Sequence, residues 1–145
     1  MKVGIKKLSE KAIIPSYGSE FAAGADLYAC IDGDLEIKPH ETALIPTGIA
    51  LELPLGYAGL IYARSGLATK KGLAPANKVG VVDCDYRGEV KVALHNHSEA
   101  AQTVAVGERV AQLVITPYLA AEFVLKDELS ETVRGSGGFG STGRK

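Results

Sequence analysis

The densest group of residues that could carry chemistry lies between positions 82 and 89, where acidic, basic and aromatic side chains follow one another closely. Asp83 ends an apolar run that begins at Val79, so its carboxylate stands where a predicted strand leaves the core. An ionised carboxylate there must be paired, bound to a metal or catalytic. Asp85 would share its strand face and could help to bind a metal or activate water, unless a turn intervenes.

The same segment also fits a structural role. An Asp at the first position and a Gly at the fourth favour a type I turn, which predicts a turn from Asp85 to Gly88. For these two residues the structural and the functional explanation both stay open. For Asp83 the three roles, which are pairing inside the protein, metal binding and catalysis, all stay open at this point.

Two other segments carry groups that bind anions. Arg64 and Ser65 combine a guanidinium, a hydroxyl and the start of a predicted short helix. Residues 134–145 hold five glycines, three basic residues, three hydroxyls and one large apolar side chain, Phe139. Glycine N–H groups can converge on phosphate oxygens, and Arg134 could bind them bidentately. Because this segment buries too little to fold alone, we expect a flexible arm that closes over a phosphate-bearing ligand.

Several weaker patterns do not support a site. Gly135, Gly137 and Gly140 match the dinucleotide-binding string, but only five residues follow, too few for the required helix. The same stretch resembles a Walker loop without its lysine. His95 and His97 flank an asparagine with no third ligand nearby, which predicts a solvated turn rather than a metal site.

The composition excludes several classes of protein. The chain has 145 residues, 46% of them hydrophobic and 23% charged, which is typical of one soluble domain. A net charge of -1 argues against a nucleic-acid binder and a polybasic membrane anchor. The longest uncharged stretch, residues 110–121, is shorter than the roughly 20 residues of a spanning helix. With no secretory signal and two cysteines, expected to be free thiols, we predict a cytoplasmic protein.

Short apolar runs separated by Gly and Pro indicate an all-β sandwich or barrel. Alternating or continuous apolar patterns predict strands over residues 48–53, 89–94, 102–106 and 110–116. One short helix is expected from Ser65 to Lys71, with Ser65 as the N-cap and Gly72 as the C-cap. The predicted organisation is a β core over residues 1–133 and a Gly-rich arm over residues 134–145.

Taken together, the motifs resemble those of the trimeric deoxyuridine triphosphate nucleotidohydrolases (dUTPases). Five segments match that family's motifs in order: Ala23–Leu27, Arg64–Gly66, Asn77–Glu89, Gly107–Leu113 and Arg134–Gly143. Departures are small, since Ala25 and Cys84 occupy positions that vary in the family and are not expected catalytic sites.

The resemblance implies a jelly-roll-like β-barrel or sandwich of the β-clip type, with one short helix, assembled as a homotrimer with shared active sites. It also implies Mg²⁺-dependent hydrolysis of dUTP to dUMP and pyrophosphate, which keeps uracil out of DNA and supplies dUMP for dTMP synthesis. Neither a nucleic acid nor a membrane is an expected partner.

By the same resemblance, Asp83 would deprotonate the water that attacks the α-phosphorus. Tyr86 would pack under the deoxyribose and exclude a 2′-hydroxyl, and Asn77 would recognise the uracil. Asp26 and Gln112 would contact Mg²⁺ through water, the ion being held mainly by substrate phosphates. The full set of implied substrate-binding residues is Arg64, Ser65, Gly66, Asn77, Gly80, Val82, Tyr86, Gln112, Arg134, Phe139, Gly140, Ser141 and Thr142.

Two alternatives stay open from the sequence. A dCTP deaminase shares the fold, although the Asp83, Asp85 and Tyr86 pattern favours the hydrolase. A nucleotide-gated binding protein would use the closing arm to signal to a partner, and an intact Asp83 does not exclude that second role.

Overall fold

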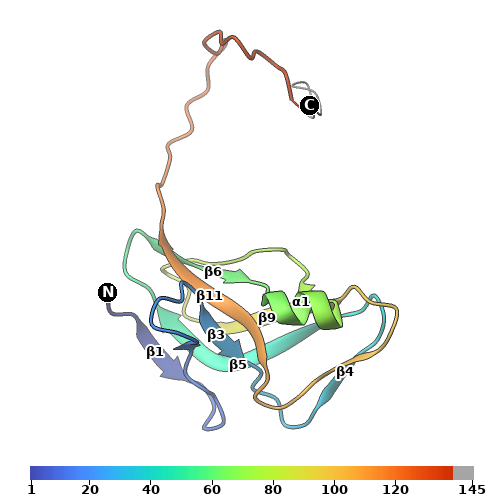
Figure 1. The fold of residues 1–145 in the computed structure, drawn as a ribbon. Helices are drawn as coiled ribbons and strands as arrows, with labels where there is room; N and C mark the ends of the chain where they lie inside the picture. Colours follow the sequence, from blue (N-terminus) through green and yellow to red (C-terminus); the bar gives the residue numbers. More distant parts are fainter. Residues whose placement is uncertain (139–145) are drawn as a thin grey trace.

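Two antiparallel β-sheets pack against each other across one apolar core (Figure 1). The structure, a computed structural model, describes residues 1–138. Its strands and single helix are β1 (Gly4–Lys7), β2 (Ser16–Tyr17), β3 (Ala25–Tyr28), β4 (Leu35–Ile37), β5 (Thr42–Glu52), β6 (Tyr57–Tyr62), α1 (Ser65–Lys71), β7 (Leu73–Pro75), β8 (Gly80–Val82), β9 (Glu89–Asn96), β10 (Gln102–Val104) and β11 (Arg109–Pro117).

The sheet topology is that of a sandwich rather than a closed barrel. One sheet has the order β1-β5-β9-β7, the other β2-β3-β11-β6-β8, and β10 and β4 form a separate ribbon. Alternate residues of β9, which are Val90, Val92 and Leu94, are at most 1% exposed and face the core, as their spacing predicts. Each such side chain contributes about 1.5–3 kcal/mol by leaving water. The expected all-β fold with one short helix is therefore confirmed.

The pairing of β5 with β9 is irregular in the middle of β5, and a hydrogen bond from this irregular part of β5 reaches the first residue of β9. The pairing register of the two strands shifts between Pro46 and Ala50, and Gly48 adopts a left-handed φ of 68°. A Cβ at Gly48 would lie 2.7 Å from Cys30 Sγ, so no larger residue fits without a shift. The N–H of Gly48 donates to Glu89 Oε1 at 2.9 Å, which fixes the residue where β9 begins.

Helix α1 spans Ser65–Lys71, the range that the sequence predicts, but its N-cap is a different residue. Gly72 takes the left-handed conformation, with φ 68°, and its N–H donates to Ala68 O. The N-cap is Arg64, whose extended backbone carries no side-chain cap, so the prediction of Ser65 as the N-cap is wrong. The Arg64 carbonyl already accepts the first helical hydrogen bond, which makes Ser65 the first helical residue.

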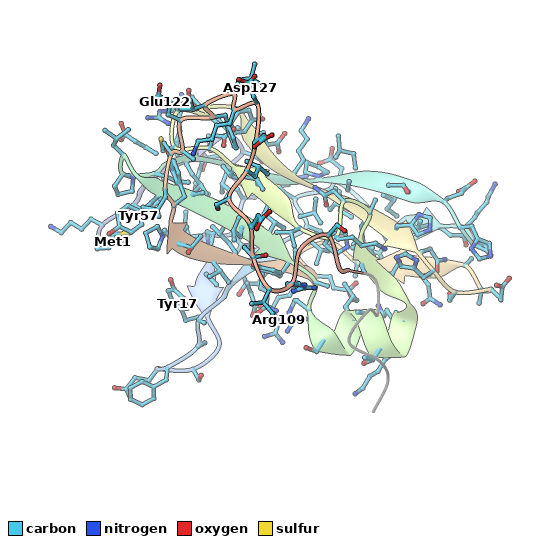
Figure 2. The ribbon with its side chains drawn as sticks, turned by 90° about the horizontal axis from the view of Figure 1, so that it is seen from above. Met1, Tyr17, Tyr57, Arg109, Glu122 and Asp127 are labelled. Carbon is cyan, nitrogen blue, oxygen red and sulfur yellow. The ribbon has the colours of Figure 1, made fainter. Side chains whose placement is uncertain are left out.

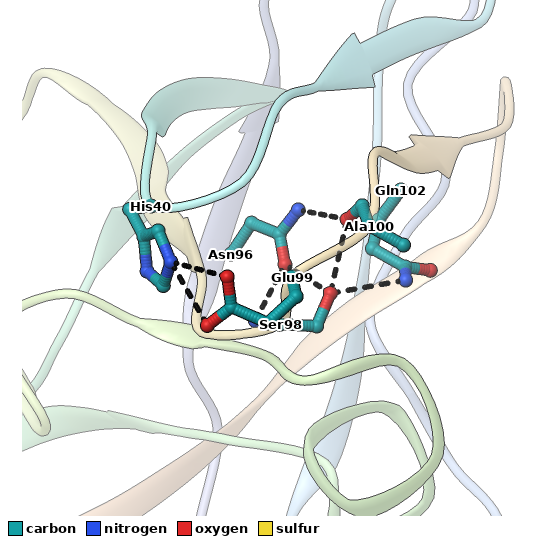
Figure 3. Close-up of polar contacts among 6 residues, drawn as sticks. All are labelled: His40, Asn96, Ser98, Glu99, Ala100 and Gln102. Carbon is teal, nitrogen blue, oxygen red and sulfur yellow. Dashed lines mark hydrogen bonds and ion pairs between the residues drawn. The ribbon is translucent and has the colours of Figure 1, made fainter.

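A buried asparagine at the end of β9 joins the last residue of β4 to the β9–β10 connection, and Figure 3 shows its contacts with Ser98 and Ala100. Asn96 is fully buried, and its Nδ2 donates to the carbonyls of Ile37 and Ala100 at 2.9 and 2.8 Å. Its Oδ1 accepts from the backbone N–H and the hydroxyl of Ser98. All of its polar atoms are therefore satisfied, which is the condition under which a buried amide stabilises a fold.

The chain leaves the sandwich after β11. Figure 1 shows residues 118–138 rising away from the sheets, and Figure 2 shows Glu122 and Asp127 on this segment from above. Its large apolar side chains are exposed, including Leu119 at 97%, Phe123 at 96% and Leu125 at 96%. Both cysteines are free thiols, as expected. Within residues 1–138 the structure contains no helix long and apolar enough to cross a membrane.

Helix α1 is attached to the β10–β11 connection by an ion pair. Lys71 Nζ lies 2.8 Å from Glu108 Oε1, and Glu108 Oε2 accepts from the N–H of Ala105 at 2.9 Å. Partial burial by itself raises the pKa of Glu108, but these hydrogen bonds and the charges of Lys71 and Arg64 outweigh it, so the pKa lies below its ordinary 4.5. A depressed carboxyl pKa stabilises the fold above the unfolded-state pKa, and that contribution is lost as the pH falls through the folded-state pKa.

Lys71→Met should therefore lower the free energy of unfolding at pH 7 by about 0.5–1 kcal/mol, a modest value because the pair is partly exposed and screened by solvent. Between pH 6 and pH 3 the variant should lose less stability than the wild type. Urea unfolding at a series of pH values measures both effects. Lys70→Met is the matched control, since Lys70 is exposed and makes no ion pair with the described residues. Identical pH profiles for Lys71→Met and wild type would contradict this account.

Candidate functional site

A hollow of about 320 Å³ gathers positive charge around one buried carboxylate. Asp26 on β3 is 8% exposed, and its two oxygens accept hydrogen bonds from two arginines. Arg64 Nε lies 2.8 Å from Oδ1, and Arg109 Nη1 lies 3.1 Å from Oδ2. Two guanidinium groups against one carboxylate leave a net positive charge, and the exposed Ser65 borders the same hollow. This first hollow is therefore suited to bind an anion such as phosphate.

Gln112 lies beside Asp26 in this hollow because the two residues are direct cross-strand partners on β11 and β3. Its Nε2 donates to Ala63 O at 2.8 Å, just before the arginine that precedes α1. A Cβ at Gly24 would lie 2.7 Å from Gln112 Oε1, so the glycine allows the amide to pack against the backbone. The side chain of Gln112 thus has a defined position facing the anion-binding groups.

The first hollow does not contain a metal cage made by protein ligands. Among residues 1–138 no three His, Cys, Asp or Glu side chains are arranged to hold a metal ion, and Asp26 is the one acidic residue that lines this hollow. Mg²⁺ commonly keeps several waters and binds through one or two carboxylates plus phosphates of the ligand. The donor set therefore fits an ion held mainly by a bound phosphate ligand, with Asp26 and Gln112 reached through water.

A second hollow, of about 340 Å³, lies over β8 and the start of β9. It is lined by an amide, a carboxylate and an aromatic ring, from Asn77, Asp83 and Tyr86, together with Gly80 and Val82. Between β7 and β8 the chain makes a tight turn in which the N–H of Val79 donates to Asn77 O at 2.7 Å. Such a combination of polar groups, backbone and one aromatic ring is typical of a pocket for a nucleoside-sized ligand.

The hairpin turn of this hollow is displaced from its predicted position. The N–H of Tyr86 donates to Asp83 O at 3.2 Å, so the turn runs from Asp83 to Tyr86 and not from Asp85 to Gly88. Arg87 explains the difference, because its Nη1 donates to the carbonyls of Cys84 and Tyr86 and stabilises the earlier turn. The two aspartates therefore do not share a strand face.

Asp83 is exposed, and among residues 1–138 its carboxylate has no hydrogen-bond or ion-pair partner. Of the three roles expected for this carboxylate, pairing inside the protein is therefore not met by the described residues, and metal binding and catalysis stay open. The carboxylate borders the second hollow beside Asn77 and Tyr86, and is free to accept a hydrogen bond or a proton from a ligand or water.

The site residues that the resemblance implies fall into two groups, which line two separate hollows of the described chain. The first hollow contains Asp26, Arg64, Ser65, Gly66 and Gln112. The second hollow contains Asn77, Gly80, Val82, Asp83 and Tyr86, and no residue from 1 to 138 lines both hollows.

The arm contributes to neither hollow in the described part of the chain. Arg134 is exposed, and its Nε donates to Gly137 O at 2.8 Å. The remaining implied residues, Phe139, Gly140, Ser141 and Thr142, lie outside the described residues.

Three residues that matter to the geometry were not identified from the sequence. Arg109 belongs to the fourth motif and forms the second ion pair of Asp26, but its role depends on strand register. Gly24 belongs to the first motif, and its close approach to Gln112 appears only in three dimensions. Glu89 is the last residue of the third motif, and its carboxylate accepts the hydrogen bond from the N–H of Gly48. Nothing in the sequence around Glu89 indicates this contact with a residue 41 positions earlier.

Sequence comparison identifies relatives along the whole chain. The dUTPase family model matches residues 10–143. A deoxyuridine 5′-triphosphate nucleotidohydrolase of Hydrogenobaculum sp. is 51% identical over 145 residues and covers 100% of both chains. The enzyme of that name from Nautilia profundicola is 51% identical over 144 residues, 99% of this chain and 100% of the relative.

Structural comparison agrees. The dUTPase of Staphylococcus bacteriophage 80alpha with dUPNHPP superposes with a TM-score of 0.90 at 29% identity and covers 98% of both chains. A mutant dUTPase of S. aureus phage phi11, described with a structural Mg(II) ion, has the same fold with a TM-score of 0.81 at 24% identity, over 90% of this chain and 100% of that one. With a family model that spans most of the chain and relatives of about half its sequence along its full length, this chain belongs to the dUTPase family.

Proposed function

We propose that the protein is a dUTP diphosphatase, which hydrolyses dUTP to dUMP and pyrophosphate. The observation that carries this proposal is the second hollow, where an uncommitted carboxylate, an amide and an aromatic ring border a space of about 340 Å³. The cationic first hollow supplies the complementary group for a triphosphate. Relatives named deoxyuridine 5′-triphosphate nucleotidohydrolase at 51% identity support the choice of substrate.

In this proposal the triphosphate binds to the cationic groups. Arg64 and Arg109 present N–H donors near one another because both pair with Asp26, and Ser65 and Gln112 add polar groups at the same hollow. Phosphoryl transfer depends mainly on positioning and on neutralising the charge of the phosphate oxygens. The groups of the first hollow do both without any covalent intermediate.

Asp83 acts as the general base. Its exposed carboxylate takes a proton from a water molecule, and the oxygen of that water forms a bond to the α-phosphorus. The bond between the α-phosphorus and the bridging oxygen breaks, and pyrophosphate leaves with that oxygen. The phosphate that stays on the nucleoside is the product dUMP.

We further propose Mg²⁺ as the cofactor. When bound, Mg²⁺ neutralises charge on the substrate phosphates, which lowers the cost of bringing a nucleophile to the α-phosphorus. Asp26 and Gln112 would hold waters of its hydration shell, which suits a hollow lined by a single carboxylate. The protein's own contribution is to orient the triphosphate with Arg64 and Arg109.

Recognition of base and sugar belongs to the second hollow. Asn77 offers an amide that can both donate to and accept from a uracil edge. The ring of Tyr86 lines the space where a deoxyribose would lie, and the 2′-hydroxyl of a ribose would need the volume that this ring occupies. In a cytoplasmic enzyme this selectivity would keep uracil out of DNA and supply dUMP for dTMP synthesis.

The assembly we propose is a homotrimer whose sites combine groups from different protomers. Two features of the single chain support it: the two hollows have separate linings, and the segment after β11 exposes several large apolar side chains to water. Isolated apolar residues on a surface are ordinary, but a series of them along an extended segment indicates an interaction surface. Residues 134–145 would then form the flexible arm that closes over a nearby site.

Asp83→Asn should lower kcat by roughly 10²–10⁴-fold, because the amide cannot accept the proton of the attacking water. Pyrophosphate release from dUTP, dCTP, dTTP and UTP measures turnover and specificity, and calorimetry with a non-hydrolysable dUTP analogue measures binding, which should persist. Asp85→Asn is the matched control, since Asp85 is an exposed neighbour that lies outside the lining of the hollow. Full turnover by Asp83→Asn would exclude Asp83 as the base, and conversion of dCTP to a uracil nucleotide by the wild type would indicate a deaminase.

Shared sites predict complementation between inactive variants. If Asp83 and Arg64 of one site come from different protomers, Asp83→Asn and Arg64→Ala chains mixed by co-refolding should regain activity, up to about a quarter of wild type for random association. Each variant alone should stay inactive at the same total concentration. If one protomer supplies both residues, no mixture can contain an intact site. Mass spectrometry of differently tagged chains establishes that mixed trimers have formed, so an inactive mixture would refute the shared site.

A chain that ends at Val133 should keep its oligomeric state but lose at least about 10²-fold in kcat, because the arm that excludes water and contacts the phosphates is missing. Light scattering measures the mass of the assembly and pyrophosphate release measures turnover. A chain that lacks only Arg144 and Lys145 serves as the control. Wild-type turnover by the chain that ends at Val133 would mean that the arm has no role in catalysis.

A further inference from the structure

Gly88 lies against the hydroxyl end of the Tyr86 ring, and its lack of a side chain is required for that close approach. A Cβ at Gly88 would come within 2.5 Å of Tyr86 Cζ and 2.9 Å of Cε2, and closer still to the hydroxyl oxygen. Gly88 is not among the residues with a left-handed φ, so backbone freedom does not explain the glycine. The steric requirement of the Tyr86 ring does.

The ring is held in this place at both ends. On the backbone side, the N–H of Tyr86 closes the turn with Asp83 O. On the side-chain side, Tyr86 Oη donates to the carbonyl of Glu89 at 3.0 Å. Glu89 is itself fixed, because its carboxylate accepts from the N–H of Gly48 and lies 3.4 Å from Lys91 Nζ. The ring position is therefore defined by the start of β9, and Gly88 provides the space between.

We propose that Gly88 is a specificity-determining positioning residue, which acts through Tyr86 to set the space available at the 2′ position of the sugar. The inference rests on the proposed function, since it assigns the Tyr86 ring to the sugar of the substrate. Gly88 does not line the second hollow, whereas Tyr86 does, so any effect of Gly88 on the ligand must pass through the ring.

A methyl group at position 88 would displace the ring rather than disrupt the fold. Tyr86 is 46% exposed, and its side chain can rotate toward solvent at little cost in buried area. The backbone around it is held by the Arg87 hydrogen bonds to Cys84 O and Tyr86 O, which do not involve the ring. Gly88→Ala should therefore give a folded protein with a misplaced ring.

The test compares dUTP with UTP, which differ only by the 2′-hydroxyl. Gly88→Ala should lower the ratio of kcat/KM for dUTP to kcat/KM for UTP by about 10-fold or more, while kcat for dUTP stays within a few-fold of wild type. Gly33→Ala is the matched control, because no atom of the described residues lies within 4 Å of a Cβ at that glycine and its φ is not left-handed. Thermal unfolding shows that both variants are folded.

A double-mutant cycle establishes that the effect passes through the ring. In a Tyr86→Ala background, Gly88→Ala should leave the dUTP/UTP ratio unchanged, since no ring remains to be displaced. A ratio that stays at the wild-type value in Gly88→Ala, or one that falls equally in the Tyr86→Ala background, would overturn the inference. Affinities of non-hydrolysable dUTP and UTP analogues provide the same comparison without turnover. Wild-type protein that fails to hydrolyse dUTP would instead refute the proposed function, and with it the assignment of the ring to the sugar.

Discussion

The double ion pair of Asp26 is the contact on which the geometry of the first hollow depends. It joins β3, the residue before α1 and the start of β11 through one carboxylate and two guanidinium groups. A carboxylate that is almost buried requires such partners, because an unpaired buried charge costs several kcal/mol. The same pairing holds Arg64 and Arg109 close together, although like charges repel. Folding thus assembles a cationic site that the two arginines would not form by themselves.

The second hollow depends on the bend in β5 instead. Gly48 turns the strand, its N–H binds Glu89, and the first residue of β9 thereby receives a fixed position next to the hairpin that carries Asp83 and Tyr86. These contacts fix the Tyr86 ring and the start of β9, while the Asp83 carboxylate has no hydrogen-bond or ion-pair partner among residues 1–138. A rigid scaffold under an exposed loop is the usual way in which proteins combine precise positioning with access.

Much of the sandwich could be predicted from the sequence, and the reasons are local. The alternation of Val90, Val92 and Leu94 identified β9 and its buried face, and Gly72 marked the end of α1. The range of α1 was predicted correctly, but its N-cap was misplaced by one residue, because a Ser is a better N-cap than an Arg, while Arg64 is constrained by its partner on a distant strand. The hairpin turn was misplaced because rules based on turn residues do not consider side-chain hydrogen bonds such as those from Arg87 to the carbonyls of Cys84 and Tyr86. Pairing of Arg109 with Asp26 depends on the register between β3 and β11, which are far apart in the sequence and adjacent in one sheet, and local patterns do not encode that register.

The exposed apolar segment after β11 also affects the solubility of a chain that has not yet met its partners. Phe123, Val124 and Leu125 are consecutive and all are exposed, a pattern that favours intermolecular β-pairing. Charged residues stand on both sides of this run, with Glu122 before it and Lys126, Asp127 and Glu128 after it. Charges in these positions act as gatekeepers against aggregation, because stacking copies in register would bring like charges together. The exposed apolar side chains of this segment therefore remain available to a specific partner surface, while the flanking charges disfavour aggregation with other copies of the chain.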